Sequence, residues 1–249
     1  MRVLTGHQPV YLPWLGLIHK ASLADVFILM DDVQYLCQDW NNRNRIKTPQ
    51  GGAIWLTVPV NQDGSKSKRL ADIRISEERN VPEHKRWQRR HWKSIQVTYS
   101  GAPYFKAYRQ FFQWLYLENQ WQYLSDLNLA ILKQIFEWFE IDATLVIGSN
   151  CRFQGKKSDL VLEHALTFDA NVVVTGAQGK GYIRFDTFSQ NNIKVVVQEF
   201  NHPVYSQRFG PFVSHLSFID LLFHHGPLSR KICMQNNITR EELWKNALI

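Results

Sequence analysis

Two short, mainly apolar runs lie near the start of the chain, with a helical pattern between them. Residues 2–5 lead into Gly6-His7-Gln8-Pro9, and residues 26–30, all apolar, end at an Asp-Asp pair. Apolar runs of this length are typical of strands buried on both faces, as in parallel sheets. Residues 14–23 carry apolar side chains at near-helical spacing. Strand, helix and strand in about 30 residues predict a Rossmann-like βαβ unit.

The middle of the chain changes from strand-like to helical patterning. Residues 38–47 are polar and predict a loop, and residues 53–60 predict a strand closed by proline. Residues 61–69, rich in Lys, Ser, Asp and Gly, predict an exposed flexible loop before a short strand candidate at 73–75. From about residue 82 to 140, apolar and aromatic residues recur at helical spacing and predict three helices.

The last third returns to alternating helix and strand patterns. Residues 159–166 and 216–223 predict helices, and residues 171–176 and 193–199 predict strands. The fold class is therefore α/β, a mostly parallel sheet with a Rossmann-like βαβ start and a helical insertion. We expect a single domain over residues 1–249, with the mainly helical section at about 82–140.

Composition and charge narrow the class of protein. The hydrophobic share of 45% and charged share of 20% fit a folded soluble chain. No apolar run approaches the roughly 18 residues of a membrane span, and the first residues lack a signal-peptide pattern. Three separated cysteines predict neither a disulfide framework nor a cysteine zinc site, so we expect a reduced, cytoplasmic compartment. The net charge of +7 favours anionic partners such as nucleotide sugars, acyl phosphates or RNA.

The densest chemical signal follows the first predicted strand. Two prolines and two glycines fix the backbone of residues 6–16, which carry polar groups next to a strand end. We interpret His7 as a catalytic base, with substrate-binding roles for Gln8, Tyr11, Trp14 and Lys20. The alternative is a rigid turn in which the imidazole only bonds to backbone. His19 at the helix also permits a weak analogy with phosphate-binding His-x-Gly-His turns.

A second group of candidates follows the second predicted strand. The carboxylates of Asp31 and Asp32 can orient an amine, act as a base or cap the next turn, and Gln34 follows them. We assign them catalytic roles. The polar stretch after them offers amides and guanidinium forks for phosphate or carboxylate, so we expect substrate contacts there. Its candidate residues are Asn42, Arg43, Asn44 and Arg45.

Later segments offer weaker candidates. Thr175, Gly176 and Tyr182 follow a predicted strand and fit substrate binding, although the loop is not a Walker motif. Ser217 and Asp220 share a helix face near His224, which permits a catalytic triad, but a helix cap is the favoured interpretation. No metal-ligand spacing is found, and the pattern leaves the cofactor unknown.

Residues 84–93 combine Lys, Arg and Trp. That composition suits RNA or a nucleotide base stacked on indole. The competing and favoured interpretation is an amphipathic helix with Trp87 and Ile95 facing the core and its arginines facing water.

Several blocks along nearly the whole chain together resemble one protein family, the WbqC-like family. The blocks are His7-Gln8-Pro9-Val10-Tyr11-Leu12-Pro13-Trp14-Leu15-Gly16, Ala24-Asp25-Val26-Phe27, Asp31-Asp32-Val33-Gln34, Asn42-Arg43-Asn44-Arg45-Ile46-Lys47, Trp55-Leu56-Thr57-Val58-Pro59, Asp126-Leu127-Asn128, Lys157-Ser158-Asp159-Leu160, Thr175-Gly176 and Leu216-Ser217-Phe218-Ile219-Asp220-Leu221-Leu222-Phe223-His224-His225-Gly226.

The resemblance implies an aminoacyl (glycyl-type) transferase that forms an amide on an amino sugar during synthesis of surface polysaccharide, the O-antigen. The expected partners are a nucleotide-linked or amino sugar substrate and, as donor, an aminoacyl-tRNA. Two alternatives stay open at this point. One is an ATP-dependent ligase or nucleotidyltransferase-like enzyme, and the other is a non-catalytic scaffold of polysaccharide assembly.

Overall fold

A five-stranded parallel sheet forms one part of the computed structural model, which describes residues 1–61 and 67–247. The loop expected at 61–69 therefore lies largely outside the described residues. The βαβ start is confirmed as β1 (Val3–His7), α1 (Leu15–Ser22) and β2 (Val26–Leu29), with β1 and β2 parallel. The other strands are β5 (Thr144–Ile147), β6 (Val172–Thr175) and β7 (Lys194–Val197).

The order of the strands is β5-β2-β1-β6-β7. Numbered in chain order, these strands run 3-2-1-4-5, the order of the first five strands of a Rossmann sheet. The predicted α/β class is thus confirmed. Strand β5 was not predicted, because its four residues, of which the last three are apolar, sit at a partly exposed sheet edge and follow a long helix without a distinct pattern of their own.

Both faces of the sheet are covered, as the continuous apolar runs required. Val3 and Phe27 point into the larger core with α1 and α4 (Leu124–Trp138), whereas Leu4 and Ile28 point into a smaller core. That smaller core is closed by α5 (Ser158–Thr167) and α6 (Phe185–Gln190). Successive residues of one strand therefore stabilise different layers, since strand side chains alternate between faces.

A second, antiparallel sheet replaces the loop that the polar pattern predicted at 38–47. Strands β3 (Arg43–Lys47) and β4 (Ala53–Thr57) form a hairpin in which Arg45 pairs with Trp55. The loop prediction was wrong for residues 43–47, because cross-strand pairing lets polar side chains occupy a strand whose alternate residues, Asn44 and Ile46, are buried. Within residues 73–75, Arg74 and Ile75 form isolated bridges, and the expected strand is not formed.

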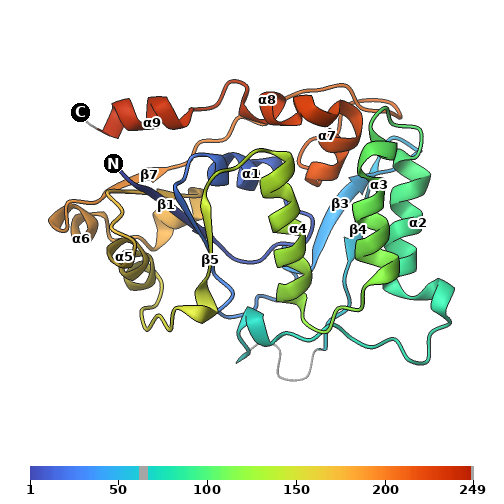
Figure 1. Ribbon diagram of the computed structural model, residues 1–249, viewed down its shortest axis with the longest axis horizontal. Helices are drawn as coiled ribbons and strands as arrows, with labels where there is room; N and C mark the ends of the chain where they lie inside the picture. Colours follow the sequence, from blue (N-terminus) through green and yellow to red (C-terminus); the bar gives the residue numbers. More distant parts are fainter. Residues whose placement is uncertain (62–66, 248–249) are drawn as a thin grey trace.

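The three helices expected between 82 and 140 are confirmed as α2 (Trp87–Tyr99), α3 (Phe105–Gln113) and α4. A π-helical turn, Trp114–Glu118, continues α3. The parallel sheet lies at the left of Figure 1, the hairpin with α2 and α3 lies at the right, and α4 stands between them. One continuous apolar core joins the two parts.

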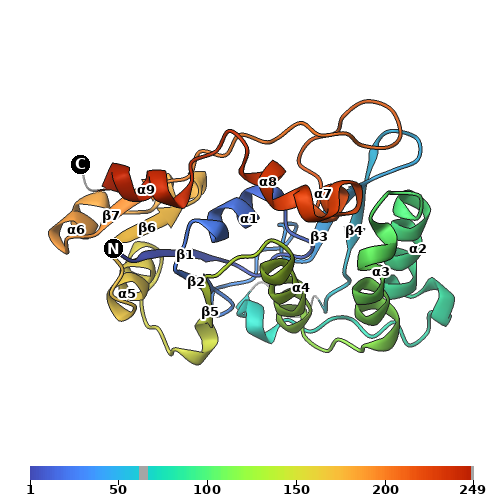
Figure 2. The same cartoon turned by 45° about the horizontal axis from the view of Figure 1, so that its top comes forward.

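The C-terminal segment returns from the hairpin side to the sheet side. Helices α7 (Phe218–His225), α8 (Ser229–Met234) and α9 (Arg240–Ala247) follow one another along one side of the molecule (Figure 2). Short 3-10 turns occupy Leu70–Asp72, Glu83–Lys85, Gly148–Asn150, Ala177–Gly181 and Gly226–Leu228.

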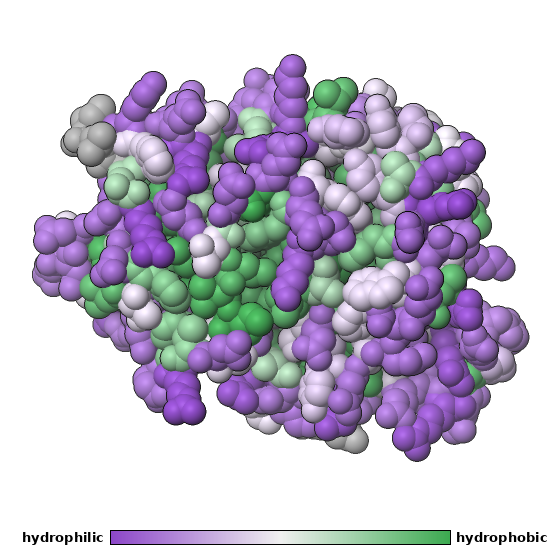
Figure 3. All heavy atoms as spheres, viewed as in Figure 1, coloured by the Kyte–Doolittle hydropathy of each residue, from purple (hydrophilic) through white to green (hydrophobic). Residues whose placement is uncertain are grey.

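On the face shown in Figure 3, apolar side chains gather over β5 and the space between β5 and α4. None of the helices described here has the length and apolar character needed to cross a bilayer.

Candidate functional site

The strand order reverses between β1 and β6, and this point organises the candidate site. In open α/β sheets, ligands bind outside the carboxyl ends of the strands where the order switches. His7 ends β1, and Thr175 ends β6 one residue beyond the pair Thr5 and Val174. The structure therefore brings together two segments at the place where this fold class binds ligands. They are residues 7–14, which follow β1 and are called the first turn, and residues 175–182, which follow β6 and are called the Thr175 loop.

His7 is held as a neutral imidazole. Its Nδ1 lies 2.9 Å from the carbonyl oxygen of Gln8, which can only accept, so Nδ1 carries the proton. Burial and the nearby Lys20 amine lower the pKa of His7 to about 3. Within the described part of the chain no hydrogen bond uses Nε2, so its lone pair is available to a ligand.

Lys20 reaches back from α1 to the same strand end. Its Nζ donates to the carbonyl oxygen of Gly6 at 2.9 Å, and the residue is only 4% exposed. Burial lowers the pKa of Lys20 to about 7. The end of β1 thus carries two basic side chains, Lys20 and His7, in a setting that disfavours their charged forms.

A row of aromatic rings leads from His7 to the hairpin. Ring centroids lie 5.4 Å apart for His7 and Trp14, 5.6 Å for Trp14 and Trp40, and 5.3 Å for Trp40 and Trp55. Trp55 is 46% exposed and offers an accessible indole at the end of the row. We call this set the aromatic row. Such rings provide faces for a sugar or a nucleobase.

Two guanidinium groups, those of Arg43 and Arg45, lie over Trp55. Their carbon atoms are 4.7 Å and 5.7 Å from the centroid of that ring. Arg43 donates to the Gln38 carbonyl and Arg45 to the His215 carbonyl, but among residues 1–61 and 67–247 neither forms an ion pair. Cations without a carboxylate partner are suited to phosphate or carboxylate groups of a ligand.

The acidic pair lies one strand further from the switch point, at the ends of β2 and β5. Asp31 accepts hydrogen bonds from the backbone N–H and the hydroxyl of Ser149, both at 2.8 Å. Burial raises the pKa of Asp32, and the charge of Asp31 adds to this. Arg69 lies close enough to oppose the shift. The pair therefore has its own set of partners, separate from those of His7 and Lys20.

The Thr175 loop supplies hydroxyls near β1. Tyr182 is 41% exposed and its hydroxyl bonds with the side chain of Thr175. Gly176 has open space where a side chain would point. Tyr182 and Gly176 are accessible at the carboxyl edge of the sheet, whereas Thr175 is buried, so of its side chain only the contact with Tyr182 links it to the surface.

The amide candidates support the backbone of the site. Gln8 receives the Asn41 amide at 3.4 Å. Asn42 donates to the Val58 carbonyl and the fully buried Asn44 to the Leu12 carbonyl. The exposed Gln34 forms a backbone bridge with Arg69. Asn42 thus closes the open end of the hairpin, and Asn44 holds the hairpin against the segment that follows β1. The arginines remain as the groups of β3 without such a role.

Tyr11 is fully buried in a hydrogen-bonded chain with Tyr116 and His91. His91 donates to the Thr57 carbonyl, so its Nδ1 accepts from the Tyr11 hydroxyl at 2.8 Å. These hydrogen bonds join the first turn to α2 and to β4. In this structure Tyr11 is a structural link, and no part of its side chain is accessible to a substrate.

Buried His91 predicts loss of stability in acid. Burial lowers its pKa to about 3 in the folded protein from 6.5. The unfolded chain therefore takes up a proton that the folded protein refuses as the pH falls from 6.5 towards 3, so stability falls. We expect the free energy of unfolding of the unsubstituted protein to fall by about 1 kcal/mol more per pH unit in that window than that of His91→Gln. Urea titrations at several pH values measure this difference. His84→Gln, which removes an exposed histidine, is the matched substitution.

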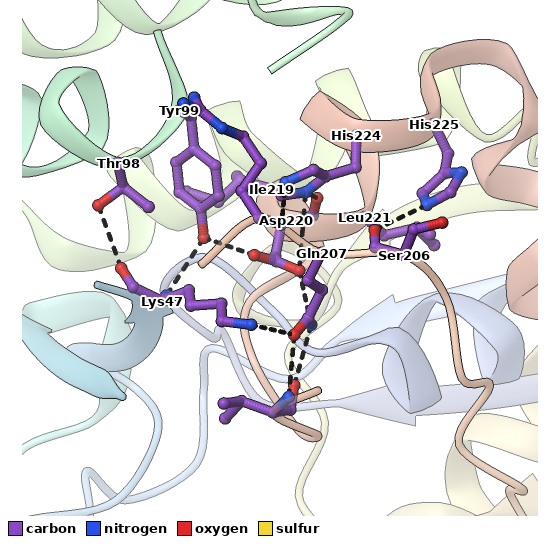
Figure 4. Close-up of polar contacts among 12 residues, drawn as sticks. Lys47, Thr98, Tyr99, Ser206, Gln207, Ile219, Asp220, Leu221, His224 and His225 are labelled. Atoms are coloured by element: carbon purple, nitrogen blue, oxygen red, sulfur yellow. Dashed lines mark hydrogen bonds and ion pairs between the residues drawn. The ribbon is translucent and has the colours of Figure 1, made fainter. Parts of the chain in front are cut away.

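Ser217 caps α7, as the favoured interpretation stated, and accepts the backbone N–H of Ile219. Asp220 lies in a buried network and receives the Tyr99 hydroxyl at 2.9 Å and the Gln207 amide at 2.8 Å (Figure 4). His224 is occupied at both nitrogens, by the Asp220 carbonyl and the Arg208 N–H. These contacts hold α7 against neighbouring segments, and Ser217, Asp220 and His224 do not form a catalytic triad.

Two other expectations are decided by burial. Helix α2 buries Trp87, Trp92 and Ile95. This confirms the interpretation as an amphipathic helix and not the alternative of a surface on which bases stack. His19 is fully buried, with Gln198 and the Ile238 carbonyl at its two nitrogens, so it does not face a ligand. The phosphate-binding analogy for His7 and His19 therefore lacks its second histidine.

Trp40 and Trp55 were not among the sequence candidates. The sequence nevertheless contains a signal for a hairpin at this place. Pro49-Gln50-Gly51-Gly52, which separates residues 43–47 from residues 53–57, is typical of a hairpin connection. A predicted hairpin would have placed Trp55 opposite Arg45.

Comparison with known proteins agrees with the resemblance seen in the sequence. The chain is 30% identical over 220 residues to the uncharacterized protein Rv1507c of Mycobacterium tuberculosis, covering 88% of this chain and 92% of the relative. No solved structure matches the chain. The WbqC-like protein family matches residues 8–232, a span that begins directly after His7 and includes residues 8–14, the hairpin and the Thr175 loop. The chain belongs to the WbqC-like protein family.

Proposed function

We propose that this protein is an enzyme that forms an amide, by transferring an acyl or aminoacyl group onto the amine of a phosphate- or nucleotide-linked amino sugar. One observation carries the proposal. The neutral imidazole of His7 and the two guanidinium groups of Arg43 and Arg45, which have no ion-pair partner in the described chain, lie at opposite ends of the aromatic row.

The parts of this site match the needs of such a reaction. Amide formation from an activated ester requires an uncharged amine nucleophile and a group that takes its proton. The Nε2 lone pair of His7 accepts an N–H of the acceptor amine and orients it. The guanidinium groups bind the phosphates, and Trp55 packs on the base or the sugar.

The finer identity of the substrates follows from the family resemblance. We propose an amino sugar destined for surface polysaccharide as acceptor and a glycyl-type donor, with aminoacyl-tRNA as one donor class. The buried tryptophans of α2 give no support to RNA binding by residues 84–93. Any RNA contact would involve the side of the hairpin that carries the exposed Trp55 and the half-buried Arg43 and Arg45.

The proposal is tested by incubating the protein with UDP-linked amino sugars and a panel of donors that includes charged tRNAs and acyl thioesters. We expect a product whose mass increases by the acyl group, detected by mass spectrometry. An arm with ATP and magnesium, assayed for AMP release, tests the ligase alternative. Absence of product with every donor would overturn the proposal in favour of a scaffold.

His7→Asn is expected to lower kcat/KM by about 10- to 100-fold, because the amine loses the acceptor that orients it. The melting temperature should change little, since within residues 1–61 and 67–247 the one hydrogen bond of the His7 ring is to the adjacent backbone carbonyl. His84→Asn, at an exposed histidine, is the matched control and should keep full activity. Equal activity of the two variants would exclude His7 from the reaction.

A further inference from the structure

Lys20 is a buried lysine whose position is not explained by an ion pair. It lies on the inward face of α1, is 4% exposed, and places Nζ 2.9 Å from the Gly6 carbonyl oxygen at the carboxyl end of β1. No salt bridge found in residues 1–61 or 67–247 includes it. Burying an ammonium group without a countercharge is costly, so proteins rarely keep one without a function.

Lys47 shows what a structural buried lysine looks like in the same protein. It is 1% exposed, donates to the Gln207 side chain at 3.0 Å and to the Pro211 carbonyl at 2.7 Å, and lies near the carboxylate of Asp220. Its charge is therefore shared among several partners, of which Figure 4 shows the Gln207 side chain. Among the described residues Lys20 bonds to one carbonyl and to no carboxylate, which leaves the lone pair of its neutral form uncommitted.

The surroundings of Lys20 favour an amine that exchanges protons near neutral pH. The titratable group that faces it is His7, on the β1 side, and that imidazole is neutral. His19, its neighbour on α1, is bonded to Gln198 and Ile238. Burial alone lowers the pKa of Lys20, to about 7. A general base works best when its pKa lies near the working pH.

The acidic pair is less suited to that role. Both carboxylate oxygens of Asp31 are engaged by Ser149, and Asp32 lies beside Gly148 at the end of β5. Lys20 instead lies beside His7 at the strand-order switch.

We propose that Lys20 is the general base that accepts the proton of the acceptor amine in the amide-forming reaction. This inference rests on the proposed function. As the sugar nitrogen bonds to the acyl carbon and the carbon–oxygen bond to the donor alcohol breaks, the nitrogen gives its proton to Nζ. The resulting ammonium passes that proton to the departing oxygen, so the products are the amide and the free alcohol, and Lys20 is again neutral.

The first arm of the test needs no activity and compares urea unfolding of the unsubstituted protein and Lys20→Met from pH 6 to 9.5. The pKa of Lys20 is about 7 in the folded protein and has its ordinary value of 10.5 in the unfolded chain. Between these two pH values, the unfolded chain holds the Lys20 proton that the folded protein has released. The folded-to-unfolded ratio of the unsubstituted protein should therefore rise about tenfold per pH unit relative to the variant. A difference that does not vary with pH overturns the inference whatever the assay shows.

The second arm measures kcat/KM against pH for the unsubstituted protein, Lys20→Met and Lys20→Arg. Arginine keeps a donor for the Gly6 carbonyl but cannot give up its proton at these pH values. We expect at least a 100-fold loss in both variants, the loss of an inflection near pH 7, and an unchanged Kd for the UDP-linked amino sugar. An arginine variant with unchanged activity and the same inflection shows that Lys20 is only a structural tie. A pH-dependent stability difference without activity in any assay rejects the proposed function while leaving the Lys20 amine as a low-pKa group.

Discussion

Asp220→Ala is expected to lower the free energy of unfolding by about 3–5 kcal/mol, the range for removing one partner of a buried ionic network. Asp220 is fully buried and receives hydrogen bonds from Tyr99 and Gln207, with Lys47 and Tyr205 nearby. Alanine removes the carboxylate that lies near the Lys47 ammonium and leaves the Tyr99 hydroxyl without its acceptor. Urea unfolding at pH 7 measures the change.

The matched control lies on the same helix. Ser217→Ala removes only the cap of α7 and should cost about 1 kcal/mol. A loss no larger for Asp220→Ala would mean that the network stabilises the fold no more than a single cap. The network matters for the site because Gln207 and Lys47 join the segment before α7 to strand β3, which carries both arginines of the site.

The double variant Arg43→Gln/Arg45→Gln should weaken binding of a UDP-linked amino sugar by about 100-fold or more. Each charge-assisted hydrogen bond to phosphate contributes about 1.5–3 kcal/mol, and neither guanidinium has a carboxylate partner in the described structure to compensate. Isothermal titration calorimetry at low and at moderate salt measures the Kd. The salt dependence of binding should fall together with the affinity.

Arg79→Gln/Arg109→Gln changes the net charge equally at exposed positions away from the aromatic row. This control should bind within a few-fold of the unsubstituted protein. Equal weakening in the two double variants would indicate a general effect of charge, and the assignment of phosphate binding to the hairpin would fail. Fluorescence of the exposed Trp55 gives an independent readout, because a ligand stacked on it changes its emission.

Prediction from sequence succeeded where a feature depends on local pattern. The all-apolar run 26–30 forms β2, because burial on both faces of a strand leaves no room for polar residues. The helical spacing of apolar residues at 14–23 likewise corresponds to α1. It failed for β3, whose polar residues become a strand only by pairing with β4. It also missed β5, an edge strand that is partly exposed and therefore weakly patterned.

The candidate site divides in the same way. Sequence placed His7, Lys20, Arg43 and Arg45 among the candidates because of residue type and position near strand ends. It also included Tyr11 and Asn44, which the structure buries in hydrogen bonds that hold segments together. Residue type alone does not separate an amide or hydroxyl that meets a ligand from one that satisfies a backbone carbonyl, since both need the same donor.

The sequence by itself determined the α/β class, the parallel βαβ start and the kinship with one family, because these follow from periodicity and from contiguous residues. Tertiary structure alone decided which distant side chains meet. It aligned His7, Trp14, Trp40 and Trp55 in one row, separated the acidic pair from it, and buried Lys20 without a counterion. The physical reason is that burial and charge neighbours arise from packing between segments far apart in the chain, and these set the state of each group.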